Sequence, residues 1–85
     1  MFVDSYMIDT ITRVNTFVSV ANISATPILV KQDNYAVNGQ SIMGLYSLDL
    51  SRPITVEFVT EEDKYLFWER YRDMLKVNIE GCANV

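Results

Sequence analysis

Apolar and polar residues alternate over several short stretches of the chain, which is the pattern of strands with one buried face. The clearest case is residues 54–59, Ile-Thr-Val-Glu-Phe-Val, directly after Pro53. Other stretches rich in strand-forming residues cover 2–8, 27–31 and 35–37. Asp33 and Asn34 separate the last two stretches and are typical turn residues. We therefore expect those two strands to form a hairpin.

Three other stretches carry apolar residues at the three-to-four-residue spacing of helices. The first follows Asp9 and Thr10, whose oxygens suit a helix N-cap. The second is short and covers 41–48, with Ser41 as its N-cap. The third begins at 60–63, Thr-Glu-Glu-Asp, which resembles a capping box with Asp at the third position after the threonine. Its apolar stripe ends near residue 76, so we expect 77–85 to be a frayed tail.

Local propensity and periodicity disagree in the first of these helices. Many of its residues are β-branched, which lowers intrinsic helix propensity. The apolar positions nevertheless repeat at helical spacing, and packing of an apolar face usually decides the outcome. They are Ile11, Val14, Phe17, Val18 and Ala21. We therefore predict a helix here.

The predicted order is strand, helix, strand, strand, helix, strand, helix, which makes the chain an α+β protein. A chain of 85 residues is expected to form one domain. We place that domain at 1–76 and the tail at 77–85. The packing that satisfies this order is a four-stranded antiparallel sheet with three helices on one face.

Composition excludes several classes of function. The net charge is −4 and the seven basic residues are scattered, which disfavours nucleic acid as a partner. The apolar runs are too short to span a membrane. The single cysteine, Cys82, cannot form an internal disulfide, which fits a reducing cytoplasmic compartment. With no histidine and no second cysteine, we expect neither a metal site nor a cofactor.

One segment carries a family resemblance. Residues 37–48 read Val-Asn-Gly-Gln-Ser-Ile-Met-Gly-Leu-Tyr-Ser-Leu. This resembles the regulatory-serine segment of HPr, the histidine-containing phosphocarrier of the bacterial sugar phosphotransferase system. The matching positions are Val37, Asn38, Ser41, Ile42, Met43, Gly44, Ser47 and Leu48. The element order over residues 2–76 also fits the HPr fold, an open-faced β-sandwich. A departure follows the second helix, where Asp49 stands at a position that is usually glycine in the family.

The resemblance implies a phosphohistidine at the start of the first helix, and this chain has no histidine. Counting back from Ser41 without gaps places Thr10 at that position, with Asp9 beside it and Arg13 near the family's arginine. A threonine hydroxyl needs an activating base to act as a nucleophile. We therefore expect a non-enzymatic protein, similar in kind to Crh, the catabolite-repression paralogue that also lacks the active histidine. A phosphocarrier that uses Thr10 or Asp9 is the alternative.

The resemblance also implies regulatory phosphorylation of Ser41, whose simpler role is to cap a helix. The residue before it is Gln40, whereas a basic residue usually precedes this serine in substrates of HPr kinase. In the family, the exposed apolar side of the second helix helps to dock partners. The implied docking residues here are Met43, Tyr46 and Arg13. Expected partners are phosphotransferase-system enzymes, HPr kinase or a transcription regulator.

The aromatic residues of the last helix are expected to lie mainly in the core. Because its apolar residues cover more than half of the helix circumference, one of Tyr65 and Trp68 is expected at the surface. An exposed aromatic side chain there would favour a homodimer or a partner surface. A purely structural or oligomeric module is therefore a further alternative.

Overall fold

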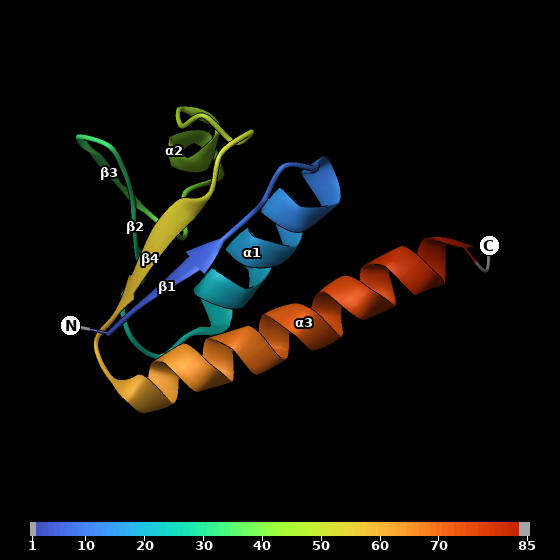
Figure 1. The fold of residues 1–85 in the computed structure, drawn as a ribbon. Coiled ribbons are helices and arrows are strands. Elements are labelled where there is room, and N and C mark those ends of the chain that lie inside the picture. The colour runs from blue at the N-terminus through green and yellow to red at the C-terminus, as the bar shows by residue number, and fades with distance from the viewer. Residues whose placement is uncertain (1, 84–85) are drawn as a thin grey trace.

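The computed structural model describes residues 2–83, with side chains described as far as Val77. Its elements follow the predicted order (Figure 1). They are β1 (Phe2–Tyr6), α1 (Ile11–Ile23), β2 (Leu29–Gln32), β3 (Tyr35–Asn38), α2 (Ile42–Tyr46), β4 (Ile54–Phe58) and α3 (Glu61–Ala83).

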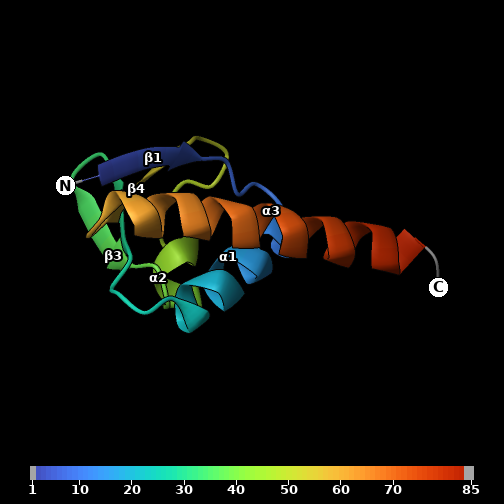
Figure 2. The ribbon, with the colours of Figure 1, turned by 90° about the horizontal axis from the view of Figure 1, so that it is seen from below.

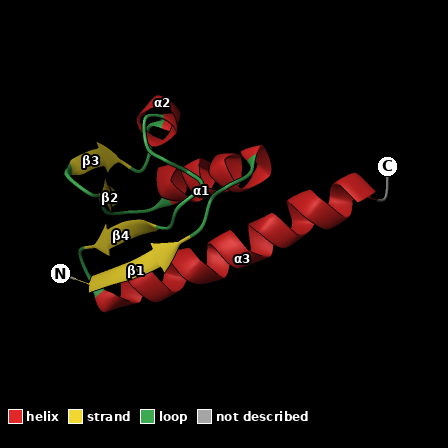
Figure 3. Cartoon of the chain, turned by 45° about the horizontal axis from the view of Figure 1, so that its top comes forward, coloured by secondary structure: helices red, strands yellow, loops and turns green. Residues whose placement is uncertain are grey.

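The four strands form one antiparallel sheet in the order β1-β4-β2-β3. Among the described residues, helices cover one face of the sheet and leave the other uncovered (Figures 2 and 3). In β4, Ile54, Val56 and Phe58 are buried, whereas Thr55 between them is exposed. The helices lie on the covered side, and α3 runs beside β1 and α1 (Figures 2 and 3). The predicted α+β architecture, with a four-stranded antiparallel sheet and three helices, is confirmed.

The core lies between the inward face of the sheet and the two longer helices. Phe17 of α1 and Phe67 of α3 are almost fully buried, and their ring centroids lie 5.0 Å apart. Tyr6, from the end of β1, packs edge-on against both rings at 5.6 Å. This aromatic contact fixes α1 against α3, and it explains why α1 is helical despite its β-branched residues.

The predicted hairpin is also present, because Gln32 pairs with Tyr35 across the two-residue turn. Asp33 in this turn has a φ of 53°. This is the left-handed region, which aspartate tolerates better than most residues. The sequence signal for the turn therefore has a direct backbone cause.

The predicted end of the last helix was wrong. Helix α3 continues to Ala83, beyond the expected end near residue 76. Residues 77–80 contain no proline or glycine, and the one glycine that follows, at position 81, costs only about 1 kcal/mol relative to alanine inside a helix. The division into a domain over 1–76 and a tail over 77–85 stays a prediction, and residues 84–85 lie outside the described part of the chain.

Candidate functional site

Thr10 begins α1 as its N-cap, as the sequence predicted. Its backbone is extended, with φ −126° and ψ 156°, and its hydroxyl oxygen accepts a hydrogen bond from the Arg13 backbone N–H at 3.2 Å. An extended residue with this bond satisfies one of the backbone N–H groups that a helix start leaves free. The position that the resemblance assigns to the phosphohistidine therefore caps α1 in this chain.

Asp9 and Arg13 form an ion pair beside this cap. The guanidinium Nη1 of Arg13 donates to the Asp9 carboxylate at 2.6 Å, and both side chains are about 39 % exposed. The two predicted residues near Thr10 are thus in contact. The pair engages the Asp9 carboxylate and reduces the charge that either side chain presents to a partner.

Ser41 begins α2 in the same way. Its φ of −99° and ψ of 109° are extended, and its hydroxyl oxygen accepts a hydrogen bond from the Gly44 backbone N–H at 3.1 Å. The turn before it is closed by the Asn38 side chain, which accepts from the Gln40 backbone N–H at 2.9 Å. The predicted capping role of Ser41 is confirmed, whereas its phosphorylation stays a prediction.

Gly39 and Gln40 fix where α2 begins. The Gly39 N–H donates to the Ile28 carbonyl at 2.8 Å. A Cβ at position 39 would lie 2.9 Å from Ile28 Cγ2, so this close approach requires glycine. The Gln40 side chain donates to the Ala21 carbonyl at 3.2 Å, which ties the start of α2 to the last turns of α1. Arg13 lies about 12 Å further back along α1, at 1.5 Å per residue.

The outer side of α2 is apolar and exposed. Met43 is 76 % exposed and Tyr46 is 46 % exposed, in agreement with the prediction, whereas Leu45 is fully buried. Ile42 is 38 % exposed and lies at the edge of this apolar side. Its position directly after the N-cap places it at the rim of the helix rather than beneath it.

This apolar side belongs to an uncharged region of the protein. Residues 14–30 and 34–48 contain no Asp, Glu, Lys or Arg. These ranges hold α1 beyond its first turn, together with all of β3 and α2. We call the surface of α1 and α2 formed by these ranges the uncharged face. An uncharged surface with protruding apolar side chains is suited to contact with another protein.

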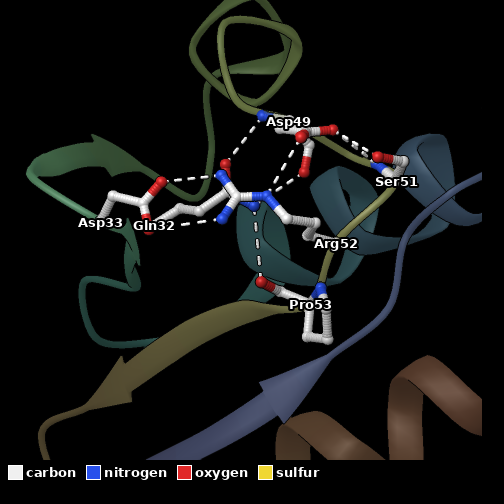
Figure 4. A network of polar contacts seen from close by, with 6 residues as sticks. All are labelled: Gln32, Asp33, Asp49, Ser51, Arg52 and Pro53. Atoms are coloured by element: carbon white, nitrogen blue, oxygen red, sulfur yellow. Dashed lines mark hydrogen bonds and ion pairs between the residues drawn. The ribbon is translucent and has the colours of Figure 1, made fainter.

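A network of polar contacts holds the segment after α2 (Figure 4). The buried Gln32 side chain donates to the Asp49 carbonyl at 2.7 Å, and its amide oxygen accepts from the Asp49 backbone N–H at 2.7 Å. Gln32 therefore pairs with residue 49 as a neighbouring strand would. Because Gln32 lies at the end of β2, the network joins the loop after α2 to the hairpin.

Arg52 adds charge to this network. It contacts Asp33 at 2.7 Å through Nη2 and Asp49 at 3.0 Å through Nε. Hydrogen bonding and attraction to Arg52 hold the pKa of Asp33 below its usual value. The pKa of Asp49 is lowered mainly by a hydrogen bond from Ser51 and then by Arg52. Both aspartates in turn raise the pKa of Arg52.

This network was not predicted from the sequence. A signal was present, because Gln32 follows Val30 by two positions in a strand and must face the same side as that buried valine. A glutamine at an inward position needs polar partners, and the loop around Asp49 supplies them.

The aromatic residues of α3 divide between core and surface. Phe67 and Tyr71 are buried, as predicted, whereas Tyr65 and Trp68 are both exposed, at 58 % and 44 %. Burial raises the pKa of the Tyr71 hydroxyl. Among the described residues, no group of three or more His, Cys, Asp and Glu side chains could hold a metal ion. Within the same part of the chain, no helix is both long enough and apolar enough to cross a membrane.

Comparison with known proteins identifies a solved structure with a similar fold. No protein-family model matches the chain, and no curated protein sequence matches it. The structure is similar to the crystal structure of HPr-C-His from Thermoanaerobacter tengcongensis, with a TM-score of 0.68 and 23 % sequence identity. The match covers 91 % of this chain and 93 % of that chain. The chain therefore has an HPr-like fold, as the segment around Ser41 indicated.

Proposed function

We propose that this chain is a non-catalytic HPr-like interaction domain, related to the bacterial sugar phosphotransferase system and switched by phosphorylation of Ser41. The observation that carries the proposal is a juxtaposition on α2. An exposed apolar side, with Met43 and Tyr46, directly follows a helix N-cap with a phosphorylatable hydroxyl. The absence of histidine from the sequence removes phosphohistidine chemistry from the same fold.

Docking through α2 has a physical basis in its side chains. Methionine adapts its shape to a partner because its thioether is flexible and polarizable. Tyrosine adds a large apolar ring with one polar atom, a combination enriched at protein interfaces. Both side chains stand on the uncharged face, so a protein partner would not have to desolvate a charge there.

Phosphorylation of Ser41 would change this surface strongly. A phosphoserine carries about −1.5 to −2 charges at neutral pH. The phosphate would sit at the start of α2, where backbone N–H groups such as that of Gly44 can donate to its oxygens. It would also place a large negative charge on a face that has none. Partners that bind one form of the protein would therefore discriminate against the other.

The switch is tested by incubation with HPr kinase, ATP and Mg²⁺, followed by intact-mass measurement. We expect one added phosphate on the wild-type chain and none on Ser41→Ala. Ser47→Ala is the matched control, because Ser47 ends the same helix and its substitution should leave the added phosphate unchanged. An unmodified wild-type chain, or equal labelling of Ser41→Ala, would remove the switch from the proposal.

The docking surface is tested by measuring the rate at which the same kinase, at a limiting concentration, phosphorylates variants of α2. Met43→Glu should lower kcat/KM for the phosphorylation by about tenfold or more, because it buries a charge in the contact. Tyr35→Glu is the control, since Tyr35 is 65 % exposed but lies in the hairpin rather than on α2. Equal effects of the two substitutions would argue against docking through α2.

The alternative is a phosphocarrier that uses Thr10 or Asp9. The contacts of these two side chains favour a phosphocarrier less than an interaction domain. The Thr10 hydroxyl caps α1, and the Asp9 carboxylate forms an ion pair with Arg13. Phosphoenolpyruvate and the first enzyme of the system should therefore leave the chain unlabelled. A label that disappears in Asp9→Asn or Thr10→Val would establish the alternative instead.

A further inference from the structure

A stripe of exposed side chains runs along the side of α3 that borders β1. Its members are Glu61, Tyr65, Trp68, Arg72 and Lys76. Each is exposed, and successive members are three or four residues apart, which places them on one side of the helix. Trp68 rests on Tyr6 of β1, with ring centroids 6.0 Å apart. We call this set the α3 stripe.

The α3 stripe borders a groove between α3 and β1. The groove is lined by Asp4 and Ser5 from the strand and by Lys64, Tyr65 and Trp68 from the helix. Strand β1 is an edge strand of the sheet and pairs with β4. Figure 2 shows α3 lying beside β1 and extending past the other elements toward the C-terminus. The side of α3 that carries the stripe is therefore exposed from Glu61 to Lys76.

The two ends of the α3 stripe carry opposite charges. It starts with the acidic Glu61, continues with the aromatic Tyr65 and Trp68, and ends with the basic Arg72 and Lys76. Trp68 stands near its middle, seven residues after Glu61 and eight before Lys76. Tyr65 and Arg72 lie three residues before Trp68 and four after it. Charge and aromatic character are thus distributed about this tryptophan in a self-complementary way.

From this distribution we infer that the α3 stripe binds a second copy of this chain, with the two α3 helices antiparallel about a two-fold axis near Trp68. The axis brings the two Trp68 rings together. It also places Glu61 against the partner's Lys76, and Tyr65 against the partner's Arg72. Two-fold symmetry repeats each contact, so one complementary stripe supplies both halves of the interface.

The contacts contribute unequally to such a dimer. The central aromatic pair excludes water and is expected to supply most of the affinity. A guanidinium beside a tyrosine ring adds cation–π attraction. The Glu61–Lys76 pairs lie at the ends, where solvent screens them, so they set the orientation more than the affinity. A parallel arrangement would bring like charges together at both ends. The α3 stripe is separate from the uncharged face, so this inference does not depend on the proposed function.

Charge reversal tests the inference on the full chain. Light scattering and sedimentation over a concentration series should show a reversible monomer–dimer equilibrium. Glu61→Lys places a lysine against the partner's Lys76, and Lys76→Glu places a glutamate against the partner's Glu61. Each single variant should weaken dimerisation by about tenfold or more, whereas the double variant restores the pair and should return to within about threefold of wild type.

Glu62→Lys is the matched control for these variants. It makes the same change in the same first turn, so it disturbs the helix dipole equally, but it lies about 100° around the helix from Glu61. Its dimerisation should match that of wild type. Trp68 is the only tryptophan in the chain, so its fluorescence gives a second readout and should shift to the blue as dimer forms. A chain that is monomeric throughout the series, or a double variant no better than the single ones, would overturn the inference.

Discussion

The starts of α1 and α2 use the same device in different surroundings. Each helix begins with an extended hydroxyl residue whose side chain accepts a backbone N–H from three positions ahead, at 3.2 Å for Thr10 and 3.1 Å for Ser41. Beside Thr10 lies an ion pair between Asp9 and Arg13. Around Ser41, residues 34–48 carry no charge. The difference is therefore electrostatic and not a matter of capping.

This difference bears on what each site can accept. A phosphoryl group on Thr10 would lie next to the Asp9 carboxylate, and like charges repel. The Arg13 guanidinium that could offset that repulsion is already bound to Asp9 at 2.6 Å. A phosphoryl group on Ser41 would meet backbone donors without a neighbouring carboxylate on α2. The start of α1 at Thr10 is therefore less suited to a phosphoryl group than the start of α2 at Ser41, although the resemblance assigns the phosphohistidine to the Thr10 position.

The largest expected effect on stability comes from truncating the buried side chain of α2. Leu45→Ala should lower the free energy of unfolding by about 2–5 kcal/mol, because Leu45 is fully buried and its truncation leaves a cavity. Met43→Ala, two positions earlier on the exposed side, should change it by less than about 0.5 kcal/mol. Urea unfolding followed by circular dichroism measures both. Similar losses in the two variants would mean that α2 does not divide into a buried and an exposed side.

Both helix starts and the fold that holds them could be predicted from the sequence. The caps at Thr10 and Ser41 follow from residue type and from the apolar spacing after them, and both are present. Their predictability has a local cause, since a cap involves only the next few residues. The HPr-like fold was predictable because the segment 37–48 and the order of elements point to the same topology.

What was missed depends on contacts between distant parts of the chain. Gln32 and Asp49 are seventeen residues apart, and the contact that joins them exists only once β2 and the loop after α2 are in place. The end of α3 was missed for a different reason. The apolar stripe stops near residue 76, but the backbone remains helical to Ala83, because periodicity reports which residues face the core and not where the helix ends.

A smaller effect compares the two caps directly. Thr10→Ala and Ser41→Ala should each lower the free energy of unfolding by about 0.5–2 kcal/mol, because each leaves a backbone N–H without its side-chain acceptor. Thr10 should matter more, since it caps the thirteen-residue α1 that holds much of the core, whereas α2 has five residues. Denaturant unfolding measures the order. The variants Thr10→Ser and Ser41→Thr keep a hydroxyl and should stay close to wild type. An alanine variant that matches its hydroxyl-bearing control would show that the cap contributes nothing.

The smallest expected effect concerns the network that holds α2 from its other end. The pKa values of Asp33 and Asp49 are lowered in the folded state, mainly by hydrogen bonds from Arg52 and Ser51 respectively. A carboxyl group whose folded pKa is depressed stabilises the fold above its unfolded pKa of about 3.9, and this contribution is lost as pH falls through the folded pKa. All three charged side chains are half-exposed, so solvent screening keeps the effect small.

Asp33→Asn isolates this contribution, because asparagine also tolerates the left-handed backbone of residue 33. The variant should be less stable than wild type at pH 7, and the gap between their urea midpoints should close as pH falls below about 4. Asp4→Asn is the control, since Asp4 lies in β1 and takes no part in the network. It should not reproduce that closing gap. A gap for Asp33→Asn that stays constant down to pH 2 would mean that the Asp33–Arg52 contact does not stabilise the fold, and the loop after α2 would then be held by its other contacts, chiefly the hydrogen bonds of Gln32.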